Sequence, residues 1–99
     1  MGLRDDVKRL AHDYVRKGGK QNRKKQAKRM LALAEFSEGL GCQDIGRLGK
    51  QHIIKFYKAN RSLSDSVIYQ HWLAFRHLWI LAKKAGEPPK PRLKNEIAP

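Results

Sequence analysis

The sequence predicts an all-α fold of four helices. Apolar residues recur at the three- and four-residue spacing of amphipathic helices, Gly and Pro clusters separate these segments, and no segment alternates like a strand. The chain has 99 residues, and 40% of them are apolar, which is a globular composition sufficient for one modest core. We therefore expect one helical domain over residues 1–87, followed by a linker over residues 88–99.

The first helix is expected over residues 3–17, before Gly18 and Gly19. Its apolar residues fall at helical spacing on one face: Leu3, Val7, Leu10, Ala11 and Tyr14. This pattern is typical of an amphipathic helix that covers a core from one side.

The second helix begins in "KGGKQNRKKQAKRM", residues 17–30, which is rich in Lys and Arg and contains no acid. This stretch runs directly into a regular apolar pattern, so we interpret it as a helix face and not as a flexible tail. The apolar side consists of Ala27, Met30, Leu31, Leu33 and Ala34, and the opposite side of Lys24, Lys25, Lys28 and Arg29. Because Lys20 and Arg23 fall over the apolar side, the first turn is expected to extend beyond the core into solvent.

A shorter third helix is expected over residues 50–59, after the glycine-rich "GLGCQDIG". Its apolar set consists of Ile53, Ile54, Phe56 and Tyr57. The fourth helix is expected to begin after Ser64, a favourable N-cap residue, and to stop at Gly86. Its predicted core stripe consists of Ile68, Trp72, Phe75, Trp79 and Ala82.

The charge balance indicates the class of partner. Lys and Arg number 22 against nine Asp and Glu, which gives a formal net charge of +13 and an isoelectric point near 10.3. In so small a domain this excess indicates a polyanionic partner, and nucleic acid is the first candidate. A membrane is not expected, because the apolar stretches are periodic and interrupted by charge. Asp5 and Asp6 stand where a signal peptide would need an apolar run, so a cytoplasmic location is expected.

The sequence offers no set of residues suited to catalysis or to holding a cofactor. The acids are dispersed, and the glycine-rich loop matches neither a dinucleotide-binding nor a Walker motif. The four histidines do not form a metal-binding pair: His12, His52, His71 and His77. Cys42 is alone, which favours a small buried apolar side chain. We expect no metal, no cofactor and no enzymatic activity for this chain.

The order of features carries a family resemblance over residues 3–92. A basic helix ending in "LGC" is followed by "IGRLGKQHIIKFYKAN", a long helix with a Ser-rich start and a Pro-containing exit. The positions concerned are Leu48, His52, Ile53, Phe56, Ser64, Val67, Leu73, Phe75, Arg76, Ala82, Gly86 and Pro91. Together they resemble the N-terminal, SAM-like core-binding domain of tyrosine recombinases, the phage-type integrases. Val67 stands where the family usually has Thr, which shifts attention for a hydroxyl contact to Ser64 and Ser66.

The resemblance implies a SAM-like four-helix bundle whose second and fourth helices face duplex DNA. In this family a separate catalytic domain of the same chain closes on the DNA from the other side and cleaves it through a phosphotyrosine. It also implies a bacterial or phage-encoded protein that is monomeric when isolated, with oligomers on DNA left open. The expected DNA contacts are Gln21, Asn22, Lys24, Lys25, Lys28, Arg29, Ser64, Ser66, Tyr69, Arg76, Lys83 and Lys84.

Two other functions remain open at this point. A basic helix does not distinguish DNA from RNA, so an RNA-binding helical module is one alternative. The other is a SAM-type protein-interaction domain, in which Leu73, Ile80 and Phe36 form a docking patch and the charge serves solubility.

Overall fold

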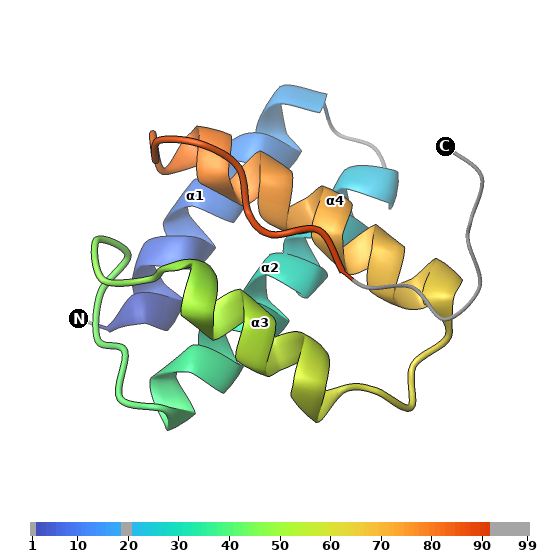
Figure 1. Ribbon diagram of the computed structural model, residues 1–99. Helices are drawn as coiled ribbons and strands as arrows, with labels where there is room; N and C mark the ends of the chain where they lie inside the picture. Colours follow the sequence, from blue (N-terminus) through green and yellow to red (C-terminus); the bar gives the residue numbers. More distant parts are fainter. Residues whose placement is uncertain (1, 19–20, 92–99) are drawn as a thin grey trace.

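A computed structural model describes residues 2–18 and 21–91 and confirms the all-α prediction with four helices. The helices are α1 (Leu3–Gly18), α2 (Gln21–Gly39), α3 (Lys50–Ala59) and α4 (Asp65–Leu81). α1 and α2 form a hairpin, α4 packs across it, and α3 lies beside the second half of α2 (Figure 1). The radius of gyration, 12.9 Å, is that expected for a single domain of this length.

The predicted apolar faces of α1 and α2 meet in the core. Leu3, Val7 and Ala11 are buried from α1, as are Met30, Leu33 and Ala34 from α2. Arg23 differs from the expectation that the first turn of the second helix extends into solvent. Its Nη1 donates to the main-chain oxygen of Tyr14 at 2.8 Å, and its guanidinium lies 4.5 Å from the centre of the Tyr14 ring. Arg23 therefore links α2 to α1 through its contacts with Tyr14. Lys20, which was expected beside it, lies outside the described residues.

The loop between α2 and α3 is shaped by the end of α2. Gly41 has φ of +94°, the amide of Gly41 donates to Glu38 O, and the amide of Cys42 donates to Ser37 O. This is the Schellman arrangement, in which glycine is the favoured residue at the left-handed position. α3 then begins at Lys50, as predicted, and Phe36 packs edge-to-face on its Phe56 with ring centres 5.5 Å apart.

α4 begins as predicted but ends earlier. Ser64 Oγ accepts a hydrogen bond from the amide of Val67 at 3.3 Å, which caps the helix. The helix ends at Leu81, before the predicted stop at Gly86, because Lys83 adopts φ of +57°. The amides of Lys83 and Lys84 donate to Ile80 O and Trp79 O, both at 3.0 Å, and complete a second Schellman motif with Lys in the place of Gly.

The core stripe predicted for α4 is correct in part. Ile68, Phe75 and Trp79 are buried, whereas Trp72 and Ala82 are half-buried. The chain after α4 turns back along this helix (Figure 1), and Trp72 donates a hydrogen bond to it at Pro88 O.

We call residues 85–91 the strap. The Nε1 of Trp72 donates to Pro88 O at 3.2 Å, and the hydroxyl of Tyr57 donates to Pro89 O at 2.9 Å. Pro88 and Pro91 are buried. The first residues of the predicted linker, 88–91, therefore pack against α3 and α4, and the remainder, residues 92–99, lies outside the described residues.

Candidate nucleic-acid interface

The first half of α2 presents a basic face to solvent. Lys24, Lys25 and Lys28 are exposed, as are Gln21 and Asn22 in the first turn. Within residues 2–18 and 21–91, none of these three lysines forms an ion pair. Their charges are therefore not neutralised by a partner in the described part of the domain. We call Lys24, Lys25 and Lys28 the α2 lysines.

The placement of these cations conflicts with the dipole of their own helix. The N-terminus of a helix carries partial positive charge, and acids in the first turn stabilise it. α1 has Asp5 and Asp6 there, and α4 has Asp65, but α2 has no acid in its first turn. Cations at this end make the start of α2 strongly electropositive, at some expense to the stability of the helix.

Arg29, predicted on the same face, is a different kind of residue. It is half-buried, and its Nη1 donates to Oε1 of Gln26 at 2.8 Å. Gln26 is only 4% exposed. The sequence interpretation missed Gln26, although a Gln within the apolar spacing of a helix is a signal for a buried polar partner. Arg29 thus satisfies a buried amide as well as bordering the basic face.

The four DNA contacts predicted on α4 and its N-cap have different environments. Ser64 is occupied by capping, and Ser66 is exposed. Tyr69 is half-buried with its ring centre 5.4 Å from that of Trp72. Arg76 is exposed, with Nη2 3.1 Å from Oε1 of Glu87 and its guanidinium 5.1 Å from the centre of the Trp72 ring.

Lys83 and Lys84 were predicted to project from the fourth helix, and this placement is wrong. Both follow the end of α4, because its last hydrogen-bonded turn closes at Lys83 and Lys84. Lys83 is exposed. Lys84 is half-buried with Nζ 5.4 Å from the centre of the Trp79 ring, and this burial lowers its pKa.

His77 on α4 lies within reach of cations from two helices. Partial burial lowers the pKa of His77, and the positive charges of Arg23 and Arg76 lower it further. The ring of His77 lies 5.2 Å from that of Tyr14 on α1. The charges of Arg23 on α2 and Arg76 on α4 therefore both act on His77.

His71 is half-buried and has a hydrogen-bonded, aromatic environment. Its Nδ1 lies 2.9 Å from Val67 O, and its ring contacts Phe56 and Phe75 with ring centres 5.4 and 6.0 Å away. Burial lowers the pKa of His71, the bond to Val67 O partly opposes this, and the charge of Arg29 adds to the lowering.

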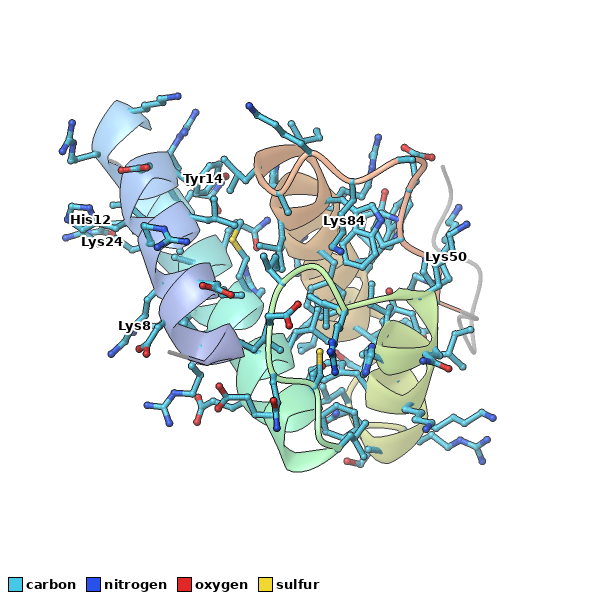
Figure 2. All side chains as sticks on the ribbon, turned by 90° about the vertical axis from the view of Figure 1, so that its left-hand side faces the viewer. Lys8, His12, Tyr14, Lys24, Lys50 and Lys84 are labelled. Atoms are coloured by element: carbon cyan, nitrogen blue, oxygen red, sulfur yellow. The ribbon has the colours of Figure 1, made fainter. Side chains whose placement is uncertain are left out.

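α1 adds basic residues that the sequence interpretation did not include. Lys8 and His12 are exposed one turn apart on its outer face, and Figure 2 shows both on the same edge of the molecule as Lys24. Arg16 and Lys17 are exposed in its last turn. The i, i+4 spacing of Lys8 and His12 away from the apolar stripe was the available signal.

Metal-binding clusters and membrane-spanning helices are absent from the described part of the chain. No three His, Cys, Asp or Glu side chains of the described residues come together in a way that would hold a metal ion. None of the helices in that part is both long and apolar enough to cross a bilayer. Cys42 is 5% exposed, its Sγ lies 3.5 Å from Asp44 O, and burial raises the pKa of its thiol.

Comparisons of the chain with models of known families, with characterised proteins and with solved structures found no match.

Proposed function

We propose that this domain binds duplex DNA through the basic face of α2 and the adjoining edge of α4. The observation that carries the proposal is the α2 lysines, which lie exposed at the positive end of their helix without ion-pair partners among the described residues. A position that is unfavourable for folding becomes favourable when phosphates approach, because counterions are released and the helix dipole attracts anions. Local conflicts of this kind are expected at functional sites.

In this proposal the α2 lysines contact phosphates and fix the position of the domain on the duplex. Gln21 and Asn22 extend the same face with neutral donors, and they are the side chains best suited to hydrogen bonds with base edges. Ser66 and Tyr69 add hydroxyl donors from α4. Most of the binding energy is then electrostatic and depends strongly on salt.

The resemblance to the core-binding domain of tyrosine recombinases gives the finer form of the proposal. Two of the matching residues have local roles that suit their positions: Ser64 caps α4, and His52 Nδ1 accepts from the amide of Gly49 at 3.0 Å to start α3. Under this proposal the fold is of the SAM-like type, and strand cleavage belongs to a catalytic domain elsewhere in the parent chain. Under this proposal, the domain alone supplies one half of a clamp around DNA and has no enzymatic activity.

The test is fluorescence anisotropy with a labelled 20-base-pair duplex at several salt concentrations. We expect Kd on the order of micromolar or weaker, because non-specific phosphate contacts dominate. The variant Lys25→Ala/Lys28→Ala should lower the slope of log K against log salt by about 1.8, since each lost phosphate contact contributes about 0.9. Arg29 is left intact, because it also satisfies Gln26.

The matched control is Lys55→Ala, which removes one exposed lysine from α3. It should leave the slope within error of the wild type, and melting temperatures should show that all variants fold. If the double variant binds duplex DNA as the wild type does, the α2 lysines are not the interface. Stronger binding to an RNA hairpin than to duplex DNA in the same assay would favour RNA as the ligand.

A protein-interaction function is the second candidate, and one observation favours it. Ile80 is 73% exposed on the outer side of α4, near the half-buried Leu73. Phe36, expected in the same patch, instead packs on Phe56. Light scattering that shows a tight homo-oligomer, together with no affinity for duplex DNA, would select this function over the first.

A further inference from the structure

We infer that Arg76 and Lys90, held over Trp72, form a second phosphate subsite that extends the DNA interface from α4 onto the strap. The inference rests on the proposed function, because its ligand is a backbone phosphate of the same duplex. Lys90 was not among the residues expected to contact DNA, since the sequence pattern places it in a linker.

The subsite is defined by one aromatic ring that holds two cations from different segments. The guanidinium of Arg76 lies 5.1 Å from the centre of the Trp72 ring, and Nζ of Lys90 lies 5.6 Å from the same centre. A cation within about 6 Å of an indole face is attracted by the ring, and Trp is the strongest such partner. The attraction of the ring for both cations counters the repulsion between them.

The backbone around Lys90 is fixed by the packing of the strap. Pro88 and Pro91 are buried on either side of it. Pro88 O accepts from Nε1 of Trp72 at 3.2 Å, and Pro89 O accepts from the hydroxyl of Tyr57 at 2.9 Å. Proline also restricts φ, so this segment has few alternative conformations. A cation placed in advance loses less conformational entropy when it binds an anion.

Glu87 forms an ion pair with Arg76 in the structure. Its Oε1 lies 3.1 Å from Nη2 of Arg76, and the two side chains are 68% and 44% exposed. An exposed ion pair of this kind contributes little to stability, so a phosphate can replace the carboxylate at Arg76. Two cations then face one phosphate, and Glu87 acts as a competitor for the subsite. This predicts opposite effects for removing Lys90 and for neutralising Glu87.

The experiment measures the salt dependence of binding to the same 20-base-pair duplex for three variants of the full chain. Lys90→Ala should lower the salt slope by about 0.9, the loss of one phosphate contact, and Lys90→Arg should restore it. Glu87→Gln should strengthen binding, because the competing carboxylate is removed. Melting temperatures of all three should stay near the wild type, since both side chains are exposed.

A second readout follows the indole N–H signals of the two tryptophans by NMR during titration with the duplex. The signal of Trp72 should shift together with the amides of α2, whereas that of the buried Trp79 should move less. This measurement reports on the subsite even if a variant alters packing of the strap.

The outcomes separate this inference from the proposed function. Suppose the wild type binds duplex DNA and Lys25→Ala/Lys28→Ala weakens it. If Lys90→Ala then behaves like the control Lys55→Ala and the Trp72 signal does not move, the subsite is wrong and the α2 interface stands. If the wild type does not bind duplex DNA, both are wrong. Weaker binding by Glu87→Gln would also overturn the competitor role.

Discussion

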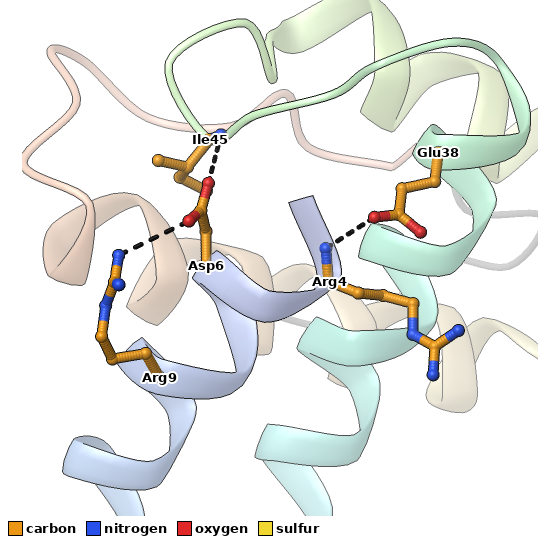
Figure 3. Close-up of polar contacts among 5 residues, drawn as sticks. All are labelled: Arg4, Asp6, Arg9, Glu38 and Ile45. Carbon is orange, nitrogen blue, oxygen red and sulfur yellow. Dashed lines mark hydrogen bonds and ion pairs between the residues drawn. The ribbon is translucent and has the colours of Figure 1, made fainter. Parts of the chain in front are cut away.

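The two ends of the α1–α2 hairpin use charge in opposite ways. At one end, where α1 begins and α2 finishes, acids and bases are tied into the fold (Figure 3). Oε2 of Glu38 accepts from the amide of Arg4 at 2.9 Å, and Oδ2 of Asp6 accepts from the amide of Ile45 at 3.2 Å. At the other end, where α1 finishes and α2 begins, exposed cations predominate, and the α2 lysines have no ion-pair partners among the residues described.

The difference separates charge that holds the domain together from charge that remains for a partner. We call the end where α1 begins and α2 finishes the acidic end, and the end where α1 finishes and α2 begins the basic end. Asp6 connects α1 to the loop before α3, and it also lies 3.5 Å from Arg9, so its carboxylate serves two contacts. Lys25 makes no comparable contact in the described part of the chain. Substitutions at the acidic end should therefore change stability, and substitutions at the basic end should change binding.

The largest expected effect is a loss of stability from a substitution in the core between the two ends. Met30 is fully buried between them, so Met30→Ala should lower the free energy of unfolding by about 2–5 kcal/mol through lost burial and a cavity. Urea denaturation followed by circular dichroism measures this. Leu31→Ala is the matched comparison and should cost less, because Leu31 is only half-buried. Equal losses for the two would show that the core boundary on α2 is misplaced.

A smaller loss of stability is expected at the acidic end. Asp6→Ala leaves the amide of Ile45 without its acceptor and removes an acid from the positive end of α1, which should cost about 1–2 kcal/mol. Asp5→Ala, at an exposed neighbouring position, loses only the interaction with the helix dipole and serves as control. The salt slope for DNA should be unchanged in both. A changed slope in Asp6→Ala would mean that the two ends do not act separately.

Acidification should affect the packing of α4 against α3, where the ring of His71 contacts Phe56. Burial lowers the pKa of His71 below its ordinary value of 6.5, so the folded state favours the neutral ring. The resulting stability is fully present above about pH 6.5 and is lost as the pH falls through the lowered pKa. The melting temperature should therefore drop between pH 7.5 and pH 5, and His71→Gln should reduce that drop. A melting temperature that rises on acidification would contradict the assigned direction.

The helices could be predicted from the sequence because their apolar residues are regularly spaced and their first residues are typical of helix starts. The third helix was placed at residues 50–59, which are also its bounds in the structure. The sequence was insufficient where tertiary contacts decide. Arg23 was assigned to solvent, but the ring and carbonyl of Tyr14 hold it, and only the hairpin brings these groups together. Likewise, the Pro-rich exit has no periodicity, and its packing depends on donors from Trp72 and Tyr57.

The candidate site could likewise be predicted from the sequence only in part. The exposed lysines of α2 follow from the helical wheel alone, because exposure is the opposite of the apolar stripe. The helical wheel does not predict the partner of Arg29 or the convergence of Arg76 and Lys90 on Trp72. These contacts join residues whose distance is fixed only by packing.

The smallest expected effect tests whether the basic end extends to the C-terminus of α4. Lys83 has φ of +57°, a conformation that is unfavourable for a residue with a Cβ. Gly41 occupies the equivalent position after α2, so glycine is suited to this turn. Lys83→Gly should raise the free energy of unfolding by about 0.5–1 kcal/mol, the relieved strain being partly offset by the greater freedom of the unfolded chain.

The same variant measures binding independently of stability, because it removes an exposed charge while the turn is kept. If Lys83 contacts a phosphate, the salt slope for duplex DNA should fall by about 0.9 even though the melting temperature rises. An unchanged slope with a raised melting temperature would limit the interface to α2 and the middle of α4. A lowered melting temperature would instead mean that the side chain of Lys83 stabilises the turn, and that the strain argument for this helix end is wrong.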